Sequence, residues 1–73
     1  MQPLTTKETE YIVDSLSNED LAIKQCIALA THTQNPAIQR ICLDLAGRHQ
    51  QHYQMLLDSL QQHIPLAPQY PQQ

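Results

Sequence analysis

The fold is decided by a polar stretch in the middle of the chain, Thr31-His32-Thr33-Gln34-Asn35-Pro36. Its first four residues end one amphipathic segment. Asn35 and Pro36 then begin a second one, because Asn is a favoured helix N-cap and Pro suits the first position of a helix. A connection this short joins antiparallel neighbours. The sequence therefore predicts an all-α fold that consists of an antiparallel two-helix hairpin.

Before this turn, apolar residues recur every three or four positions from Ile12 to Ala30, over roughly five helical turns. Glu19 is the polar member of this stripe. Thr5 and Glu8 have the spacing of a capping box at the start of the segment. Poor helix formers occur between residues 15 and 20, but the stripe stays in phase across them. We therefore expect one continuous helix over about residues 6–31.

After the turn, a second apolar stripe predicts a helix over residues 36–63. Its members are Ile38, Cys42, Leu45, His49, His52, Leu56 and Leu60. Gly47, in the middle, costs about 1 kcal/mol relative to Ala, and it marks either a close helix approach or a tolerated substitution. Three prolines in residues 64–73 exclude a regular helix there. The chain thus divides into a helical hairpin, residues 1–63, and a Pro-rich tail that is either an untethered terminus or a recognition segment.

The composition excludes several functional classes. The chain of 73 residues has a net charge of −3, only four Lys and Arg, and no basic cluster. This argues against binding to nucleic acid and to anionic membrane surfaces. No apolar run approaches the roughly 20 residues that span a bilayer, and residues 1–6 do not resemble a signal peptide. We expect a cytoplasmic protein with two reduced cysteines, Cys26 and Cys42, and no enzymatic activity, since no nucleophile arrangement or phosphate loop is present.

The apolar faces of the two helices are too large to cover each other completely. An exposed apolar patch of that size usually marks an interface. A twofold dimer of hairpins would bury both faces in a four-helix bundle. We therefore expect a homodimer whose interface contains Leu16, Ile23, Ile27, Ile38, Leu45 and Leu56.

Three polar residues fall within the apolar stripes and form the candidate site. Glu19 and His49 are each fifteen residues from Gln34, so the hairpin should place them at the same height, with His52 beside them. A buried carboxylate must be paired, neutral or metal-bound. Two interpretations are open: a polar layer that fixes the register of the dimer without a cofactor, or a site for zinc or another transition metal. A di-iron centre is disfavoured, because each hairpin offers only one carboxylate there.

Several stretches together resemble the spore coat F family, namely Leu4-Thr5-Thr6-Lys7-Glu8, Glu19-Asp20-Leu21, Thr33-Gln34-Asn35-Pro36 and His49-Gln50-Gln51-His52-Tyr53. The resemblance covers residues 4–62 and implies a small ferritin-like protein of spore-forming bacteria. It also implies a role in sporulation or in the spore coat without established catalysis, with other coat proteins as partners.

The ferritin-like pattern Glu-x-x-His is replaced here by His49 and His52, so the resemblance does not carry metal chemistry with it. We expect a structural or interaction protein that acts as a helical dimer and is deposited in the spore coat. The alternative is a small metal-binding ferritin-like protein that uses Glu19, His49 and His52.

Overall fold

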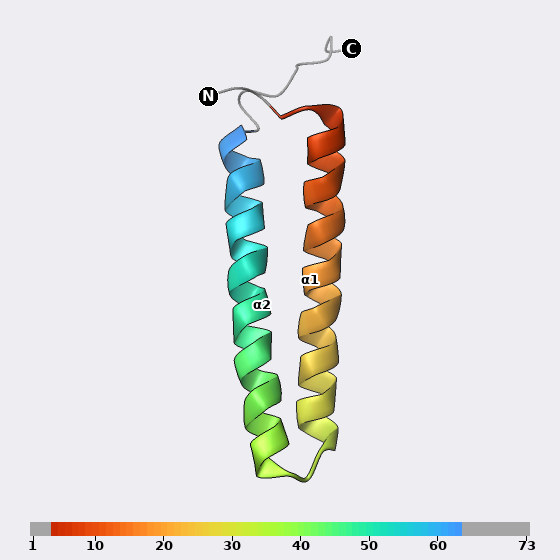
Figure 1. Ribbon diagram of the computed structural model, residues 1–73, viewed down its shortest axis with the longest axis vertical. Helices are drawn as coiled ribbons and strands as arrows, with labels where there is room; N and C mark the ends of the chain where they lie inside the picture. The colour runs from red at the N-terminus through yellow and green to blue at the C-terminus, as the bar shows by residue number, and fades with distance from the viewer. Residues whose placement is uncertain (1–3, 64–73) are drawn as a thin grey trace.

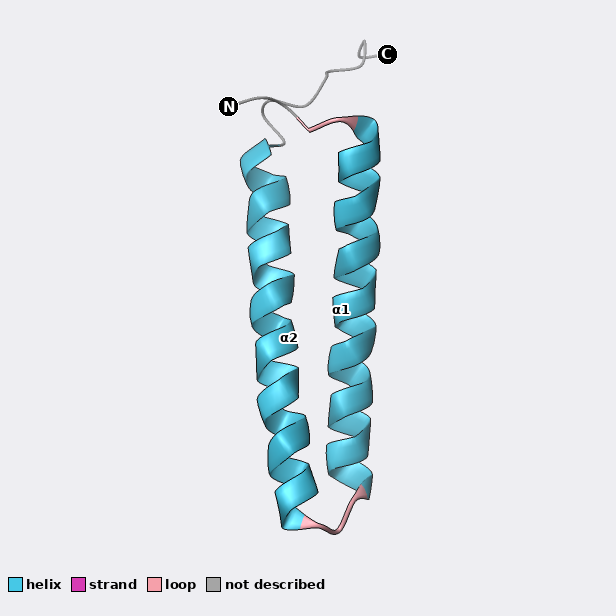
Figure 2. Cartoon of the chain, in the orientation of Figure 1, coloured by secondary structure: helices cyan, strands magenta, loops and turns pink. Residues whose placement is uncertain are grey.

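The protein is a hairpin of two long α-helices lying side by side (Figures 1 and 2). A computed structural model describes residues 4–63, in which α1 spans Thr6–His32 and α2 spans Pro36–His63. Each helix is about 40 Å long. The helices run antiparallel, so the start of α1 and the end of α2 lie at the same end of the hairpin. The predicted all-helical hairpin is confirmed, and the Pro-rich tail, residues 64–73, lies outside the described residues.

The start of α1 is fixed by the predicted capping box. The Thr5 hydroxyl accepts a hydrogen bond of 3.0 Å from the backbone N–H of Glu8, and the Glu8 carboxylate accepts one of 2.9 Å from the N–H of Thr5. Two N–H groups that have no partner within the helix are satisfied in this way. The hydrogen bond from Thr5 also holds the pKa of Glu8 below its ordinary value. From here α1 continues without interruption to His32, one residue beyond the predicted end.

A side chain of α2 helps to close the end of α1. The N–H of Thr33 donates to the carbonyl of Leu29 at 2.9 Å. The amide of Gln39, in the first turn of α2, donates to the carbonyl of Ala30 at 3.1 Å. Carbonyls at a helix C-terminus lack partners within their own helix. Gln39 therefore links the two helices at the turn, a role that the sequence did not indicate.

The start of α2 matches the sequence prediction. The Asn35 side-chain oxygen accepts hydrogen bonds from the N–H groups of Ala37 and Ile38, at 2.9 and 3.3 Å. Pro36 occupies the first helical position, where its missing N–H leaves no bond unmade. Asn35 is thus a helix N-cap, and the turn contains only residues 33–35.

The surface between the helices follows a heptad pattern. The less exposed residues recur at alternating four- and three-residue steps, which is the spacing of a coiled coil. We call these residues the seam: Ile12, Leu16, Glu19, Ile23, Cys26 and Ala30 on α1, and Cys42, Ala46, His49, Tyr53, Leu56 and Leu60 on α2. Within the described residues only Ala30, Cys42 and Ala46 are fully buried.

The seam of α2 differs from the predicted stripe by part of a helical turn. Ala46, which is 6% exposed, packs against α1, whereas the stripe residue Leu45 is 40% exposed, as a residue of the predicted dimer interface can be in a single hairpin. His52 was expected to lie in line with the buried face, and that prediction is wrong, since its side chain is more than half exposed. The physical reason is that small residues let two helix axes approach closely. In a hairpin by itself, Ala46 allows a closer contact than Leu45 does.

Gly47 and the two cysteines resolve further expectations. A Cβ atom added to Gly47 would meet no atom within 4 Å, so Gly47 does not mark a close approach of the two helices. The tolerated-substitution interpretation is the correct one within the hairpin. Cys26 is half-buried and Cys42 is buried, and both are free thiols, as expected.

Both helices carry polar residues along the side away from the seam. Neither helix in residues 4–63 combines the length and the apolar character needed to cross a membrane.

Candidate functional site

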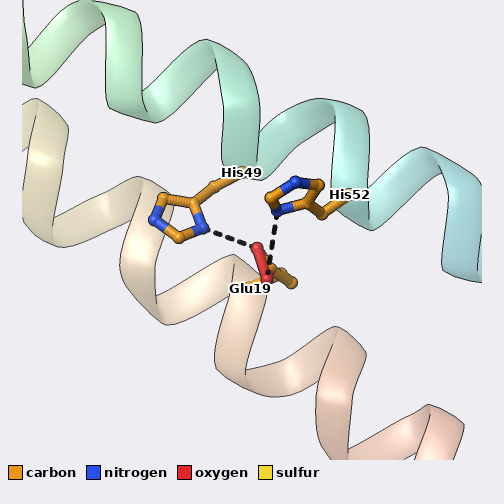
Figure 3. A group of neighbouring side chains, drawn as sticks. All are labelled: Glu19, His49 and His52. Carbon is orange, nitrogen blue, oxygen red and sulfur yellow. Dashed lines mark hydrogen bonds and ion pairs between the residues drawn. The ribbon is translucent and has the colours of Figure 1, made fainter.

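The candidate site lies midway along the hairpin, where both helices contribute polar side chains to an otherwise apolar seam (Figure 3). Glu19 comes from the middle of α1, and His49 and His52 come from the middle of α2. Glu19 and His49 face each other because each is fifteen residues from Gln34, at the turn. The prediction that the three residues meet is confirmed.

The carboxylate of Glu19 faces one imidazole with each of its oxygens. Its Oε2 accepts a hydrogen bond from Nδ1 of His49, at 2.7 Å. Its Oε1 lies 3.6 Å from Nδ1 of His52, which is within ion-pair range but beyond a good hydrogen bond. The two imidazole rings meet edge to face with their centroids 5.9 Å apart. Figure 3 shows both rings turned toward the carboxylate.

The three side chains of the site differ in how much solvent they meet, and the His52 side is the most open. The side chains of Glu19 and His49 are 21% and 30% exposed, whereas that of His52 is 56% exposed. His52 is more open because it stands one position before the seam residue Tyr53. A hydrogen bond in a partly buried setting is stronger than the same bond in water. No fully buried side-chain polar atom among residues 4–63 lacks a hydrogen-bond partner.

The arrangement has two chemical capabilities. An ionised Glu19 requires a proton on Nδ1 of His49, which makes the pair a polar contact that specifies the helix register. Sliding α2 by one heptad would remove His49 from Glu19 and leave a half-buried carboxylate without its partner. Alternatively, the three side chains can each offer one ligand atom, and these atoms all lie within 4.8 Å of one another. Imidazole nitrogens with a carboxylate oxygen form a donor set for zinc and similar transition metals.

Neighbouring carboxylates are engaged elsewhere. Asp20 follows Glu19 in the sequence, but its Oδ2 lies 2.8 Å from Nζ of Lys24, one turn along α1. Glu8 is held in the capping box at the start of the helix. Each described hairpin therefore brings one carboxylate to the site, as the sequence indicated, and lacks the additional carboxylates that bridge two metals in ferritin-like centres.

The remaining histidines and the cysteines also lie outside the site. His32 and His63 each place Nδ1 2.7 Å from a backbone carbonyl one turn earlier in their own helix. Cys26 and Cys42 are each seven residues from the nearest residue of the site, which corresponds to about 10 Å along a helix. This leaves His49 and His52 as the only imidazoles of the described chain near Glu19.

The residues predicted for a dimer interface separate into two groups. Leu16, Ile23 and Leu56 are half-buried seam residues, whereas Ile27, Ile38 and Leu45 are exposed. Met55 was not among the predicted interface residues, yet it is the most exposed of the large apolar side chains and helps to line a shallow hollow beside the site. The other residues of this hollow are His52, Leu56 and Ser59. Their spacing of three and four residues was the signal that could have identified this surface.

Comparison with known proteins gives no relative of this chain. No known family model, curated protein or solved structure matches it. The resemblance to the spore coat F family therefore stays a prediction.

Proposed function

We propose that this protein is a structural or interaction module that acts as a helical homodimer, with two hairpins packed into a four-helix bundle. One observation carries the proposal: large apolar side chains are exposed, while the fully buried residues of the described hairpin are all small. Ten large apolar residues are 40% or more exposed: Tyr11, Val13, Leu21, Ile27, Leu29, Ile38, Ile41, Leu43, Leu45 and Met55. An apolar surface of this extent favours association.

Six of these exposed residues lie on one side of the hairpin. We call this surface the apolar flank, and it comprises Tyr11, Leu29, Ile38, Ile41, Leu45 and Met55. Leu29 and Leu45 each stand one position before a buried seam alanine. In antiparallel helices, positions that precede the seam in this way lie on the same side of both helices. Residues 38, 41, 45, 52 and 55 also keep the heptad spacing, so the flank runs parallel to the seam.

The apolar flank is also poor in charge. On α1 the flank passes through residues 11, 15, 18, 22, 25 and 29, and none of them is Asp, Glu, Lys or Arg. On α2 it passes through residues 38, 41, 45, 48, 52, 55 and 59, and Arg48 is the only one of these four residue types there. The opposite flank carries Val13, Ile27 and Leu43 but also Asp20 and Lys24. A surface with little charge can face its own copy without placing like charges together, which suits a twofold dimer. Of the six predicted interface residues, Ile38 and Leu45 lie on the apolar flank, and Ile27 falls on the opposite flank. Leu16, Ile23 and Leu56 lie in the seam between the two helices.

The resemblance to the spore coat F family supports a more specific assignment. We propose that the dimer is a component of the spore coat, with other coat proteins as partners and without a catalytic role. Antibody detection in coat extracts from spores of the source organism tests this proposal. Presence only in vegetative cells would refute it and leave the dimer proposal intact.

The dimer is tested with the untagged full chain by native mass spectrometry and sedimentation velocity over a range of concentrations. We expect a dimer, and we expect Leu45→Glu to dissociate it while Leu43→Glu does not. Leu43 is the matched control because it is similarly exposed but lies on the opposite flank. Leu45 is 40% exposed in the hairpin, so burying the rest of its apolar surface on dimerisation contributes about 0.6–1.2 kcal/mol per copy. Losing this burial in both copies should weaken the dimer roughly tenfold or more.

Two results would contradict this proposal. A chain that stays monomeric at all concentrations would refute the proposed four-helix bundle. Dissociation by Leu43→Glu alone would move the interface to the opposite flank. Far-UV circular dichroism of each variant establishes that the helices are intact before the masses are compared.

A further inference from the structure

We propose that Glu19, His49 and His52 bind a single divalent transition-metal ion, with zinc as the best-fitting candidate. Each imidazole would supply one nitrogen and the carboxylate one oxygen. This binding site is separate from the proposed dimerisation, because one hairpin contains all three ligands.

The distances between the ligand atoms support this proposal. Zinc binds imidazole nitrogen and carboxylate oxygen at about 2.0–2.2 Å, so tetrahedral geometry sets neighbouring ligand atoms about 3.3–3.6 Å apart. In the hairpin, the Glu19 oxygens lie 2.7 Å from Nδ1 of His49 and 3.6 Å from Nδ1 of His52. These two distances involve different oxygens of Glu19, and the three ligand atoms all lie within 4.8 Å of one another. An ion that replaces the proton shared by Glu19 and His49 therefore requires the ligand atoms to move closer together by up to about 1.5 Å.

The donor set defines the class of metal. Two imidazoles and one carboxylate form a three-ligand zinc site that keeps an open position for water. The same donors suit Fe²⁺, Ni²⁺ and Cu²⁺, whereas Mg²⁺ and Ca²⁺ prefer oxygen ligands throughout. The site holds one ion because Asp20 is paired with Lys24 and no second carboxylate is close.

The fold already holds the three ligand side chains close together before an ion binds. His49 and His52 project from one helix three residues apart, which places their rings on neighbouring positions of one surface. Glu19 comes from the other helix and is already oriented by its hydrogen bond to His49, thirty residues away in the sequence. The exposed His52 gives an ion access from solvent. A bound ion would therefore connect α1 to α2 and stabilise the hairpin.

The test uses the untagged full chain, freed of metal with a chelator and then titrated with zinc chloride by isothermal titration calorimetry. We expect one ion per chain and a higher Tm with zinc than without it. Replacing the exposed ligand, His52→Ala, should weaken zinc binding by about a hundredfold, that is about 2.8 kcal/mol at 1.4 kcal/mol per factor of ten. Glu19→Gln should weaken it as well. The matched control is His32→Ala, since His32 is an exposed histidine whose Nδ1 lies 2.7 Å from the Ala28 carbonyl of its own helix, away from the site.

Cobalt provides a second readout that is independent of heat or stability. Co²⁺ bound by the native chain should show the intense visible absorption of a tetrahedral site, and His52→Ala should remove it while His32→Ala keeps it. The metal site is overturned if native protein binds no zinc, or if His52→Ala binds zinc as tightly as the native chain. It is also overturned if a Cys26→Ala, Cys42→Ala double variant abolishes binding, or if one ion binds per two chains. Sedimentation velocity of the same samples measures the oligomeric state independently of zinc binding. A failure of the metal proposal can therefore be told apart from a failure of the dimer proposal.

Discussion

Replacing Gly47 with alanine should stabilise the protein. Gly47 lies in mid-helix without a positive φ, and an added Cβ would meet no atom of the hairpin within 4 Å. The substitution therefore gains the full difference in helix propensity, about 0.8–1.0 kcal/mol, with no steric cost. For a domain of this size, that gain corresponds to a rise in Tm of roughly 4–8 °C. Urea denaturation followed by far-UV circular dichroism measures the change in the free energy of unfolding.

A reciprocal variant provides the control for Gly47→Ala. Ala28 is an exposed helical residue of α1, so Ala28→Gly should destabilise by a similar amount, about 1 kcal/mol. The reasoning is refuted if Gly47→Ala destabilises the protein while Ala28→Gly behaves as expected. That outcome would mean that another chain approaches the helix at Gly47. Since Gly47 lies beside Leu43 and Gln50, on the opposite flank, it would also contradict dimerisation through the apolar flank.

The remaining predictions concern the two helix starts. Asn35→Ala should cost about 1 kcal/mol of unfolding free energy, because the N–H groups of Ala37 and Ile38 lose their side-chain acceptor. An unchanged urea midpoint would show that the cap contributes nothing. Glu8 has a folded pKa below its ordinary value of 4.5, so its stabilisation of α1 is present above that pH and is lost as the pH falls through the folded pKa. An acid titration by circular dichroism should show this loss in the native chain and a smaller one in Glu8→Gln.

The turn and the candidate site were predictable because short-range chemistry fixes both. Asn35 and Pro36 are suited to a helix start, and no other stretch of the helical region combines an N-cap residue with proline. Once the turn is located, antiparallel geometry sets the height of every residue. Counting fifteen residues in each direction from Gln34 therefore brings Glu19 to His49, and the structure has a hydrogen bond there.

The rotation of α2 about its own axis was not predictable in the same way. Apolar residues cover a wide arc of the surface of α2. Two neighbouring lines of residues with heptad spacing, one through Leu45 and one through Ala46, could therefore each form the contact with α1. The predicted stripe follows the line with Leu45, whose larger side chain would bury more apolar area. The hairpin instead packs the line with Ala46, where small size permits close approach. Nothing in the residue order ranks these two effects, so the exposure of His52 could not be derived from it.

The heptad spacing of the seam has a geometric consequence for any partner. An α-helix has 3.6 residues per turn, so a contact line with a 3.5-residue period must wind around the helix axis in a left-handed sense. With a typical pitch of about 150 Å, a hairpin about 40 Å long turns through roughly a quarter of a revolution. The apolar flank shares this period and curves with it. A flat surface can therefore touch only part of the flank, whereas a second chain with the same twist can follow it from end to end.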